Sequence, residues 1–283
     1  MTANRRQRVS PLEAEIKRRL DAEMVRRSLV SSRDAARREI EAGRVLVDGS
    51  FATKPARMVD TAQSVTLIGP PPRYVGRGGE KLQGALDAFD IDPRGLRCLD
   101  AGSSTGGFTD CLLQRGAASV LAVDVGTNQL HERLRADDRV EVRERTDVRS
   151  LAVEDFDAPF DLIVGDLSFI SLRLVLPALI PLVGDGCSLL LLIKPQFEAG
   201  RQEASKGRGV ITDPEIWRRA IDGVVAVAAD NGAGLAGLTP SSITGTAGNV
   251  EFLAWLRRGR PSIPDSGRAR DVAVLQAKDM GRG

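Results

Sequence analysis

The chain of 283 residues contains little histidine, cysteine or aromatic side chain, and it has no long apolar run. Its single histidine, His131, excludes metal sites built from several histidines and argues against Ser-His-Asp chemistry, so we expect no metal. The three cysteines, Cys98, Cys111 and Cys187, have neither disulfide nor metal-ligand spacing, which favours a reducing compartment. Because a bilayer-spanning run and a signal peptide are also absent, we expect a cytoplasmic protein.

Charge is uneven along the chain, although the net charge is only +2. Residues 1–68 hold 14 Lys and Arg against 9 Asp and Glu, a net charge of +5, which leaves −3 for the remainder. A basic module joined to a slightly acidic one is typical of a protein whose first part holds a polyanion while the second does chemistry. A solvated basic face without a partner is the alternative.

Composition divides the chain into five segments. A basic extension (1–16) precedes a small module (17–68) with two amphipathic helices and short strands. A linker rich in Pro and Gly (69–77) follows, then a large segment (78–258). The tail (259–283) holds Pro, Gly, Ser and charges without a period, which predicts disorder.

Two glycines in the small module mark turns. Gly43 follows the apolar stripe of the second helix and is expected as its C′ residue. Asp48-Gly49 follows the strand Val45-Leu46-Val47 and is typical of a tight hairpin turn.

From Arg97 the large segment alternates between strand and helix periods, which predicts an α/β doubly wound sheet with helices on both faces. The expected strands are 97–101, 119–124, 140–145, 161–166, 188–194, 235–243 and 250–256. The expected helices are 80–90, 107–116, 128–135, 172–183 and 214–230.

A glycine-rich turn ends the first of these strands. Asp100 and Gly102 stand at the strand end, Gly106-Gly107 opens the next helix, and Asp124 ends the following strand. Glycine lets the backbone approach a nucleoside closely, and an acid about 20 residues on can bind its ribose hydroxyls. An acid at position 100 would repel a pyrophosphate but suits a cationic ligand with an amino group. The pattern therefore indicates S-adenosylmethionine rather than NAD, with a turn that binds no ligand as the alternative.

Further polar residues end the later strands at the edge where such sheets bind ligands. Asp147 follows the third strand and could accept from an adenine amino group, Asp166 ends the fourth, and Lys194 ends the fifth. A strand-end cap explains any one of them more simply than a ligand does. Together with Asp100 and Asp124 they make five at one edge, which caps do not explain well.

Lys194 is the strongest candidate for chemistry, because the run Leu189 to Ile193 ties it to a buried strand. Desolvation and nearby cations lower the pKa of a lysine side chain, and such a lysine can act as a general base near neutral pH. Lys81 is a candidate second cation. The acids Asp166 and Glu251 could hold both ammonium groups in place.

The small module resembles an S4 RNA-binding domain. The resemblance rests on Arg19-Leu20-Asp21, Ser32-Arg33, Gly43-x-Val45-x-Val47-Asp48-Gly49 and Lys54-Pro55. It implies a small α+β domain whose second helix lies against folded RNA. Arg33, Arg37 and Arg38 on that helix would then contact phosphates, with an unpartnered basic face as the alternative.

The set Lys81, Asp166, Lys194 and Glu251 resembles the K-D-K-E tetrad of FtsJ-type ribose 2′-O-methyltransferases. With the S4-like module in front, the chain resembles TlyA-type rRNA methyltransferases, a family that also carries the name haemolysin. The resemblance implies a Rossmann-like sheet and S-adenosylmethionine-dependent 2′-O-methylation of ribosomal RNA, at a cytidine of 16S and/or 23S rRNA. In that mechanism Lys194 takes the 2′-hydroxyl proton and Asp166 orients Lys194. Lys81 stabilises the oxyanion, and Glu251 holds Lys81 or the ribose.

The same resemblance implies further contacts. The cofactor would be bound by Asp100, Gly102, Ser104, Gly106, Phe108, Asp124, Asp147 and Asp166. Arg77 and Arg208 would contact RNA, Arg208 from a basic glycine-containing loop that is either a lid or an ordinary solvated loop. Ribosomal RNA or a ribosomal subunit is the expected partner, with no membrane and no obligate protein partner.

Three other functions compete with this interpretation. An RNA-binding protein with a vestigial cofactor pocket would not need the four tetrad residues. A membrane-lytic haemolysin would need a long apolar or strongly amphipathic segment. An NAD-dependent oxidoreductase is disfavoured by the glycine spacing.

Overall fold

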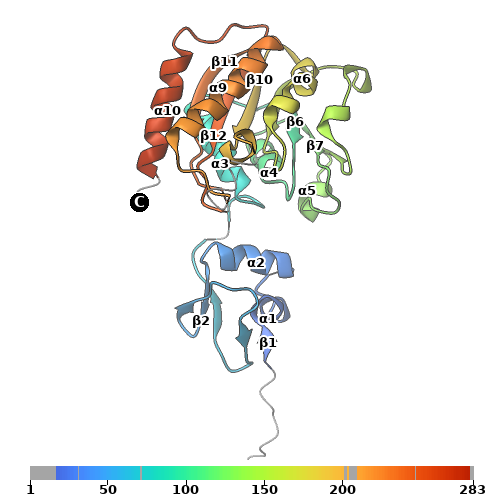
Figure 1. The fold of residues 1–283 in the computed structure, drawn as a ribbon. Coiled ribbons are helices and arrows are strands. Elements are labelled where there is room, and N and C mark those ends of the chain that lie inside the picture. Colours follow the sequence, from blue (N-terminus) through green and yellow to red (C-terminus); the bar gives the residue numbers. More distant parts are fainter. Residues whose placement is uncertain are drawn as a thin grey trace, which may run out of the picture. The chain divides into compact units, whose positions relative to one another are not determined.

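The computed structural model describes residues 17–30, 32–70, 72–200, 203, 209–245 and 247–280. The chain divides into two units, Met1–Pro71 and Pro72–Gly283 (Figure 1).

The first unit packs two helices on short antiparallel strands around one small core. Leu20 and Met24 of the first helix and Ala36 and Ile40 of the second are buried there, at the spacing that the apolar stripes predict. The second helix starts at a serine cap, because the Ser32 side chain accepts from the backbone N–H of Ala35. The elements are β1 (Arg18–Arg19), α1 (Leu20–Arg26), α2 (Arg33–Glu41), β2 (Val45–Val47), β3 (Ser50–Phe51), β4 (Met58–Val59) and β5 (Val65–Leu67).

Both predicted turns of this unit are found. Gly43 directly follows the C-cap of α2 with φ of +67°, a left-handed conformation that glycine adopts without strain. Asp48 and Gly49 both have positive φ, +51° and +78°, as the tightest hairpin turns require. They join β2 to its antiparallel partner β3.

The second unit is built on one seven-stranded sheet in the order β11-β12-β10-β9-β6-β7-β8. The five strands from β10 to β8 are parallel, whereas β12 runs antiparallel to both β10 and β11. The predicted α/β architecture is confirmed. The strands are β6 (Arg97–Ala101), β7 (Ser119–Val123), β8 (Val140–Arg143), β9 (Phe160–Gly165), β10 (Val183–Ile193), β11 (Ala233–Pro240) and β12 (Phe252–Arg258).

Helices cover both faces of this sheet. Alternate residues along β10 point to opposite faces: Leu189 and Leu191 join one core, and Leu190 and Leu192 join the other. This is why the central strands are apolar without interruption. α6, α9 and α10 cover the first face, and α3, α4 and α5 the second. The helices are α3 (Gly78–Ala88), α4 (Gly107–Gln114), α5 (Glu132–Arg135), α6 (Leu176–Leu179), α7 (Pro195–Glu198), α9 (Pro214–Asp230) and α10 (Ser266–Met280).

Two predicted segments differ in detail. The helix expected over 172–183 is broken into 3₁₀ and α turns, and Pro177 and Pro181 in this segment each lack a backbone donor. The linker expected over 69–77 is shorter, because Tyr74 is buried in the second unit, where its ring packs against Gly79. Its hydroxyl donates to Gln83.

The prediction of a disordered tail is wrong. Residues 266–280 form α10, which lies beside α9 (Figure 1) and packs on β11. Ala273, Val274 and Ala277 are fully buried on this helix. These residues form a narrow apolar stripe of small side chains. Because many Pro, Gly and Ser residues surround it, the helical period is hard to recognise in the sequence.

A matched pair of substitutions tests this packing. We expect Val274→Asp to lower the free energy of unfolding by about 3 kcal/mol or more, because it buries an unpaired charge. Val272→Asp, two residues away on the exposed side of α10, should change it by less than about 0.5 kcal/mol. Urea titrations of both variants give the comparison, and equal effects would show that α10 is not packed on the sheet.

Candidate active site and basic surface

A pocket of the second unit lies at the carboxyl ends of β6, β9 and β10, with a volume of about 520 Å³. Parallel strands leave their polar end residues at one edge, which is the edge where doubly wound sheets bind ligands. The pocket is lined by Arg77, Gly78, Lys81, Gly102, Ser103, Ser104, Thr105, Gly107, Phe108, Asp166, Ser168, Phe169, Lys194, Gln196, Phe197, Gly209, Gly245, Ala247, Asn249 and Glu251.

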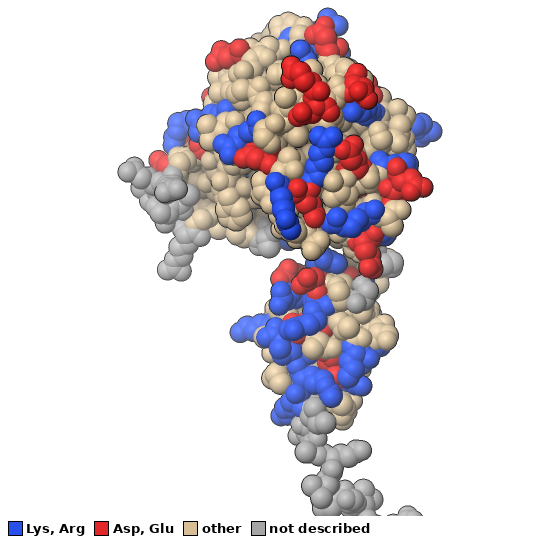
Figure 2. Space-filling view, turned by 90° about the vertical axis from the view of Figure 1, so that its right-hand side faces the viewer, with Lys and Arg blue, Asp and Glu red and all other residues tan. Residues whose placement is uncertain are grey.

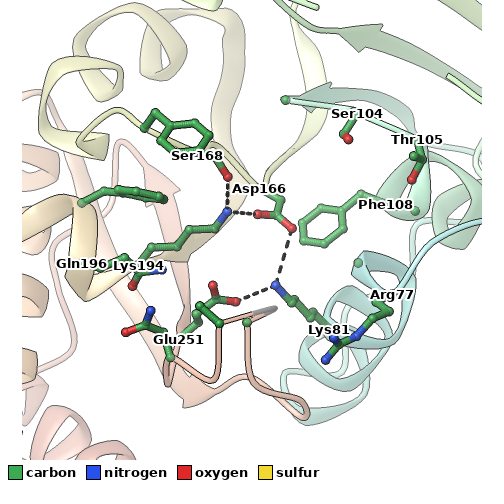
Figure 3. A pocket seen from close by; sticks show the side chains of 18 of the residues that line it. Arg77, Lys81, Ser104, Thr105, Phe108, Asp166, Ser168, Lys194, Gln196 and Glu251 are labelled. Carbon is green, nitrogen blue, oxygen red and sulfur yellow. Dashed lines mark hydrogen bonds and ion pairs between the residues drawn. The ribbon is translucent and has the colours of Figure 1, made fainter. Parts of the chain in front are cut away.

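The four predicted catalytic residues form one connected chain of ion pairs in this pocket (Figure 3). Asp166 lies between the lysines: its Oδ1 is 2.6 Å from Nζ of Lys194, and its Oδ2 is 3.8 Å from Nζ of Lys81. Lys81 in turn donates to Oε2 of Glu251 at 2.5 Å. Lys81, Lys194 and Glu251 are buried, so their charges compensate one another within the chain.

Four different elements supply these side chains. Asp166 and Lys194 directly follow the neighbouring parallel strands β9 and β10. Glu251 directly precedes β12, which runs antiparallel to β10 and therefore begins at the same edge. Lys81 lies in the first turn and a half of α3.

The segment that follows Asp166 makes further contacts. The Ser168 hydroxyl accepts from Nζ of Lys194 at 2.7 Å. Glu198, which is buried in α7, accepts from the backbone N–H of Leu172 at 2.7 Å and from the Ser171 hydroxyl. Because α7 begins next to Lys194, the two Glu198 bonds tie the chain after β9 to the chain after β10.

The glycine-rich loop forms the opposite wall of the pocket. Gly102 has φ of +82°, and a Cβ there would lie 3.1 Å from the backbone oxygen of Asp166. Asp124 holds the loop, because its carboxylate accepts from the backbone N–H of Ser104 at 2.8 Å. It also accepts from the backbone N–H of Gly126, just after β7, at 2.7 Å. The loop is therefore preformed by an acid at the tip of β7.

Asp100 is placed differently from the sequence interpretation. Its side chain is fully buried and does not line the pocket; Oδ2 accepts from the backbone N–H and the hydroxyl of Thr109 in the first turn of α4. Burial raises the pKa of this carboxyl to about 7, against the opposing effect of the Thr109 bonds. Oδ1 has no hydrogen-bond partner among the described residues.

The other predicted cofactor residues divide into two groups. Gly102, Ser104, Phe108 and Asp166 line the pocket, as does Arg77, whose guanidinium donates to the backbone oxygen of Thr244. The remaining ones lie outside the lining: Gly106 is the N-cap of α4, Asp124 supports the loop, and Asp147 caps a 3₁₀ turn and pairs with Arg149 at 2.5 Å. Arg208 lies outside the described residues.

Sequence reasoning missed several lining residues, notably Ser168, Gln196 and Asn249. Nothing in a single sequence distinguishes these residues from their neighbours. The side chain of Phe169 is 91% exposed at the pocket. Its φ of +65° is unusual for a bulky residue.

Two of the predicted RNA-binding arginines of the first unit, Arg33 and Arg37, lie beside a buried acid. Asp21 accepts from Arg19 at 2.9 Å and from Arg33 at 3.1 Å, and Arg37 lies 3.8 Å away. The Arg19 bond is the largest cause that lowers the pKa of Asp21 to about 2. Arg38 lies on the same helix, α2. Lys and Arg dominate the face of this unit seen in Figure 2.

The described residues contain no group of three or more His, Cys, Asp or Glu side chains suited to a metal ion. None of the helices they form has the length and apolar character needed to cross a bilayer.

Comparison with known proteins gives the family. Residues 74–258 match the FtsJ-like methyltransferase family. The chain belongs to that family. Residues 18–65 match the S4 domain, so the resemblance of both parts is confirmed.

Several known proteins are similar to this chain over most of its length. The chain is 48% identical over 240 residues to a Mycobacterium tuberculosis protein named 16S/23S rRNA (cytidine-2'-O)-methyltransferase TlyA, covering 84% of this chain and 89% of that protein. It is 38% identical over 237 residues to Hemolysin A of Brachyspira hyodysenteriae, covering 83% and 98%. A solved structure from Streptococcus thermophilus with a hemolysin name is 39% identical, with a TM-score of 0.75 over 94% of this chain and 97% of that one.

The buried carboxyl of Asp100 predicts a pH dependence of stability. The folded state retains this proton up to about pH 7, whereas an unfolded chain loses it near pH 4. Because the folded state binds more protons between these values, Asp100 makes the free energy of unfolding fall as the pH rises from about 4 to about 7.

Asp100→Asn keeps an acceptor for Thr109 and has no proton to lose, so the fall should be smaller in this variant. Urea midpoints measured between pH 4 and pH 7 give the two curves. The paired Asp21 titrates near pH 2, below this window. Parallel curves for the two proteins would show that Asp100 does not titrate there.

Proposed function

We propose that this protein transfers a methyl group from S-adenosylmethionine to a ribose 2′-oxygen of ribosomal RNA, with Lys194 as the general base. The observation that carries the proposal is the chain of ion pairs Lys194–Asp166–Lys81–Glu251 at the pocket. The name of the Mycobacterium tuberculosis relative supports a cytidine of 16S or 23S rRNA as the target. Ribosomal RNA as substrate implies action in the cytoplasm.

The pocket residues fit S-adenosylmethionine. When bound, this molecule supplies a methyl group on a positively charged sulfur, which needs no further activation. Gly102 and Gly107 line the pocket and let the loop pack closely on its neighbours, since a Cβ at either glycine would lie about 3 Å from backbone atoms of other segments. Asp124 beneath the loop would bind the ribose hydroxyls, and Asp166 would favour a positive charge nearby.

Lys194 acts on the target hydroxyl. Its Nζ accepts the 2′-hydroxyl proton while the 2′-oxygen forms its bond to the methyl carbon and the carbon–sulfur bond breaks, leaving the electron pair on sulfur. Asp166, 2.6 Å from Nζ, orients the amine and compensates the charge that it gains.

Lys81 stabilises the negative charge that develops on the 2′-oxygen. Its ammonium group is held by Glu251 at 2.5 Å and is 3.8 Å from Asp166, so it is positioned before substrate binds. A preformed charge in a site with little water costs no reorganisation during the reaction. Positioning by these fixed groups supplies most of the rate gain.

RNA is held by surfaces beside the site and in the first unit. Arg77 lines the pocket and carries a charge suited to a phosphate of the target strand. The exposed ring of Phe169, 5.3 Å from the ring centre of Phe197, provides a face on which the target base stacks. The S4 unit contributes phosphate contacts through Arg33, Arg37 and Arg38.

Lys194→Ala tests the catalytic assignment. We expect methyl transfer to unmodified ribosomal subunits to fall at least about 1000-fold, since general-base catalysis is lost, while S-adenosylmethionine binding changes little. Transfer of labelled methyl and calorimetric binding give the two values. Lys278→Ala on α10 is the control and should behave as wild type.

Two outcomes contradict the proposal. Wild-type turnover by Lys194→Ala would remove this lysine from the mechanism. A wild-type protein that binds ribosomal RNA but neither binds S-adenosylmethionine nor transfers methyl would be an RNA-binding protein with a vestigial pocket.

Charge removal on α2 tests the RNA surface. The triple variant Arg33→Gln, Arg37→Gln, Arg38→Gln should bind ribosomal RNA more weakly and show a shallower salt dependence. The slope of log K against log salt should fall by about one for each arginine that contacts a phosphate.

A second triple variant provides a control of equal charge. Arg94→Gln, Arg260→Gln and Arg268→Gln remove three exposed arginines from the second unit. This variant should keep the wild-type slope. Equal slopes for the two triple variants would show that α2 makes no specific contact with RNA.

A further inference from the structure

Two oxygen atoms lie close to the amino group of Lys194, one in an ion pair and one in a hydrogen bond, and both come from one short segment. Asp166 Oδ1 lies 2.6 Å from Nζ, and Ser168 Oγ accepts from Nζ at 2.7 Å (Figure 3). Asp166 explains the charge balance of the site. Ser168 carries no charge, so its contact with the lysine needs a separate explanation.

Packing does not supply that explanation. The Ser168 side chain is exposed, and within the described part of the chain its hydroxyl makes only the bond to Lys194. Ser171, three residues on, is the one whose hydroxyl anchors this segment, through Glu198. Ser168 therefore lines the pocket without holding the fold together.

The tetrahedral geometry of the Lys194 amine gives the Ser168 hydroxyl a role. A lysine nitrogen has four tetrahedral positions, one of which is the bond to Cε. In the neutral amine, two of the others hold N–H groups and the third holds the lone pair. With Asp166 as the single acceptor, the lone pair could occupy either remaining position, whereas a second acceptor leaves it one.

We propose that Ser168 is a positioning residue that directs the Lys194 lone pair toward the ribose hydroxyl bound in the pocket. This inference rests on the proposed role of Lys194 as general base. The neutral amine donates one N–H to Asp166 and the other to Ser168. Its remaining position is then available to the 2′-hydroxyl, whose proton it accepts.

Three substitutions at position 168 separate orientation from bulk. Ser168→Ala removes the acceptor, so we expect the single-turnover rate to fall about 5- to 20-fold. A fall of this size corresponds to the loss of about one hydrogen bond, together with a Lys194 lone pair that can occupy two positions in place of one. Ser168→Thr keeps the hydroxyl and should restore the rate to within about 2-fold. Ser168→Cys, with a weak acceptor, should resemble alanine. The KM for S-adenosylmethionine and for the ribosomal subunit should not change.

Ser242→Ala is the matched control, because among the described residues the exposed Ser242 hydroxyl bonds only to the backbone oxygen of Glu80. It should retain the wild-type rate. Three outcomes would overturn the proposal: a wild-type rate for Ser168→Ala, a loss that threonine does not restore, or a change in KM with an unchanged rate.

The activities of Lys194→Ala and Ser168→Ala distinguish the role of Ser168 from the proposed function. If Lys194→Ala is inactive and Ser168→Ala is fully active, only the role of Ser168 is wrong. If Lys194→Ala turns over normally, both are wrong.

Discussion

The shared carboxylate of Asp166 is the interaction on which the site depends. Two lysines buried near each other would repel, and each would be costly to remove from water alone. Asp166 contacts both, and Glu251 compensates the second, so the two positive and two negative charges of this chain of ion pairs balance. Because an unpartnered buried charge is strongly unfavourable, each member constrains the position of the other three.

Strand direction explains how four distant residues meet. Asp166 and Lys194 emerge together because β9 and β10 are parallel neighbours. Glu251 reaches the same edge from the opposite end of a strand, since β12 is antiparallel to β10 and starts where β10 finishes. The switch to antiparallel pairing at this side of the sheet thus brings the fourth charge into the site, and Glu198 then fixes the loops between strands.

The two acids of the glycine-rich region show how one residue type serves two purposes. Asp124 lies just beyond the end of β7, where its oxygens accept from loop N–H groups. Asp100 is still within β6, opposite Ala122 and Val164, and its side chain points into the core beneath α4. A difference of two positions along the strands separates an acid that supports the binding loop from one that is withdrawn from solvent.

The sequence by itself determined the features that local signals encode. The α/β alternation, the turns at Gly43 and Asp48-Gly49, and the four tetrad residues were all predicted from period, turn chemistry and motif. The burial of Asp100, the helix α10, the exposure of Phe169 and the Ser168 contact were decided by tertiary structure. Each of these depends on surfaces that distant segments supply: α4 covers Asp100, and β11 and α9 cover the narrow stripe of α10. A pattern along the chain records which side chains are apolar, whereas a contact also requires a partner whose position only the assembled sheet determines.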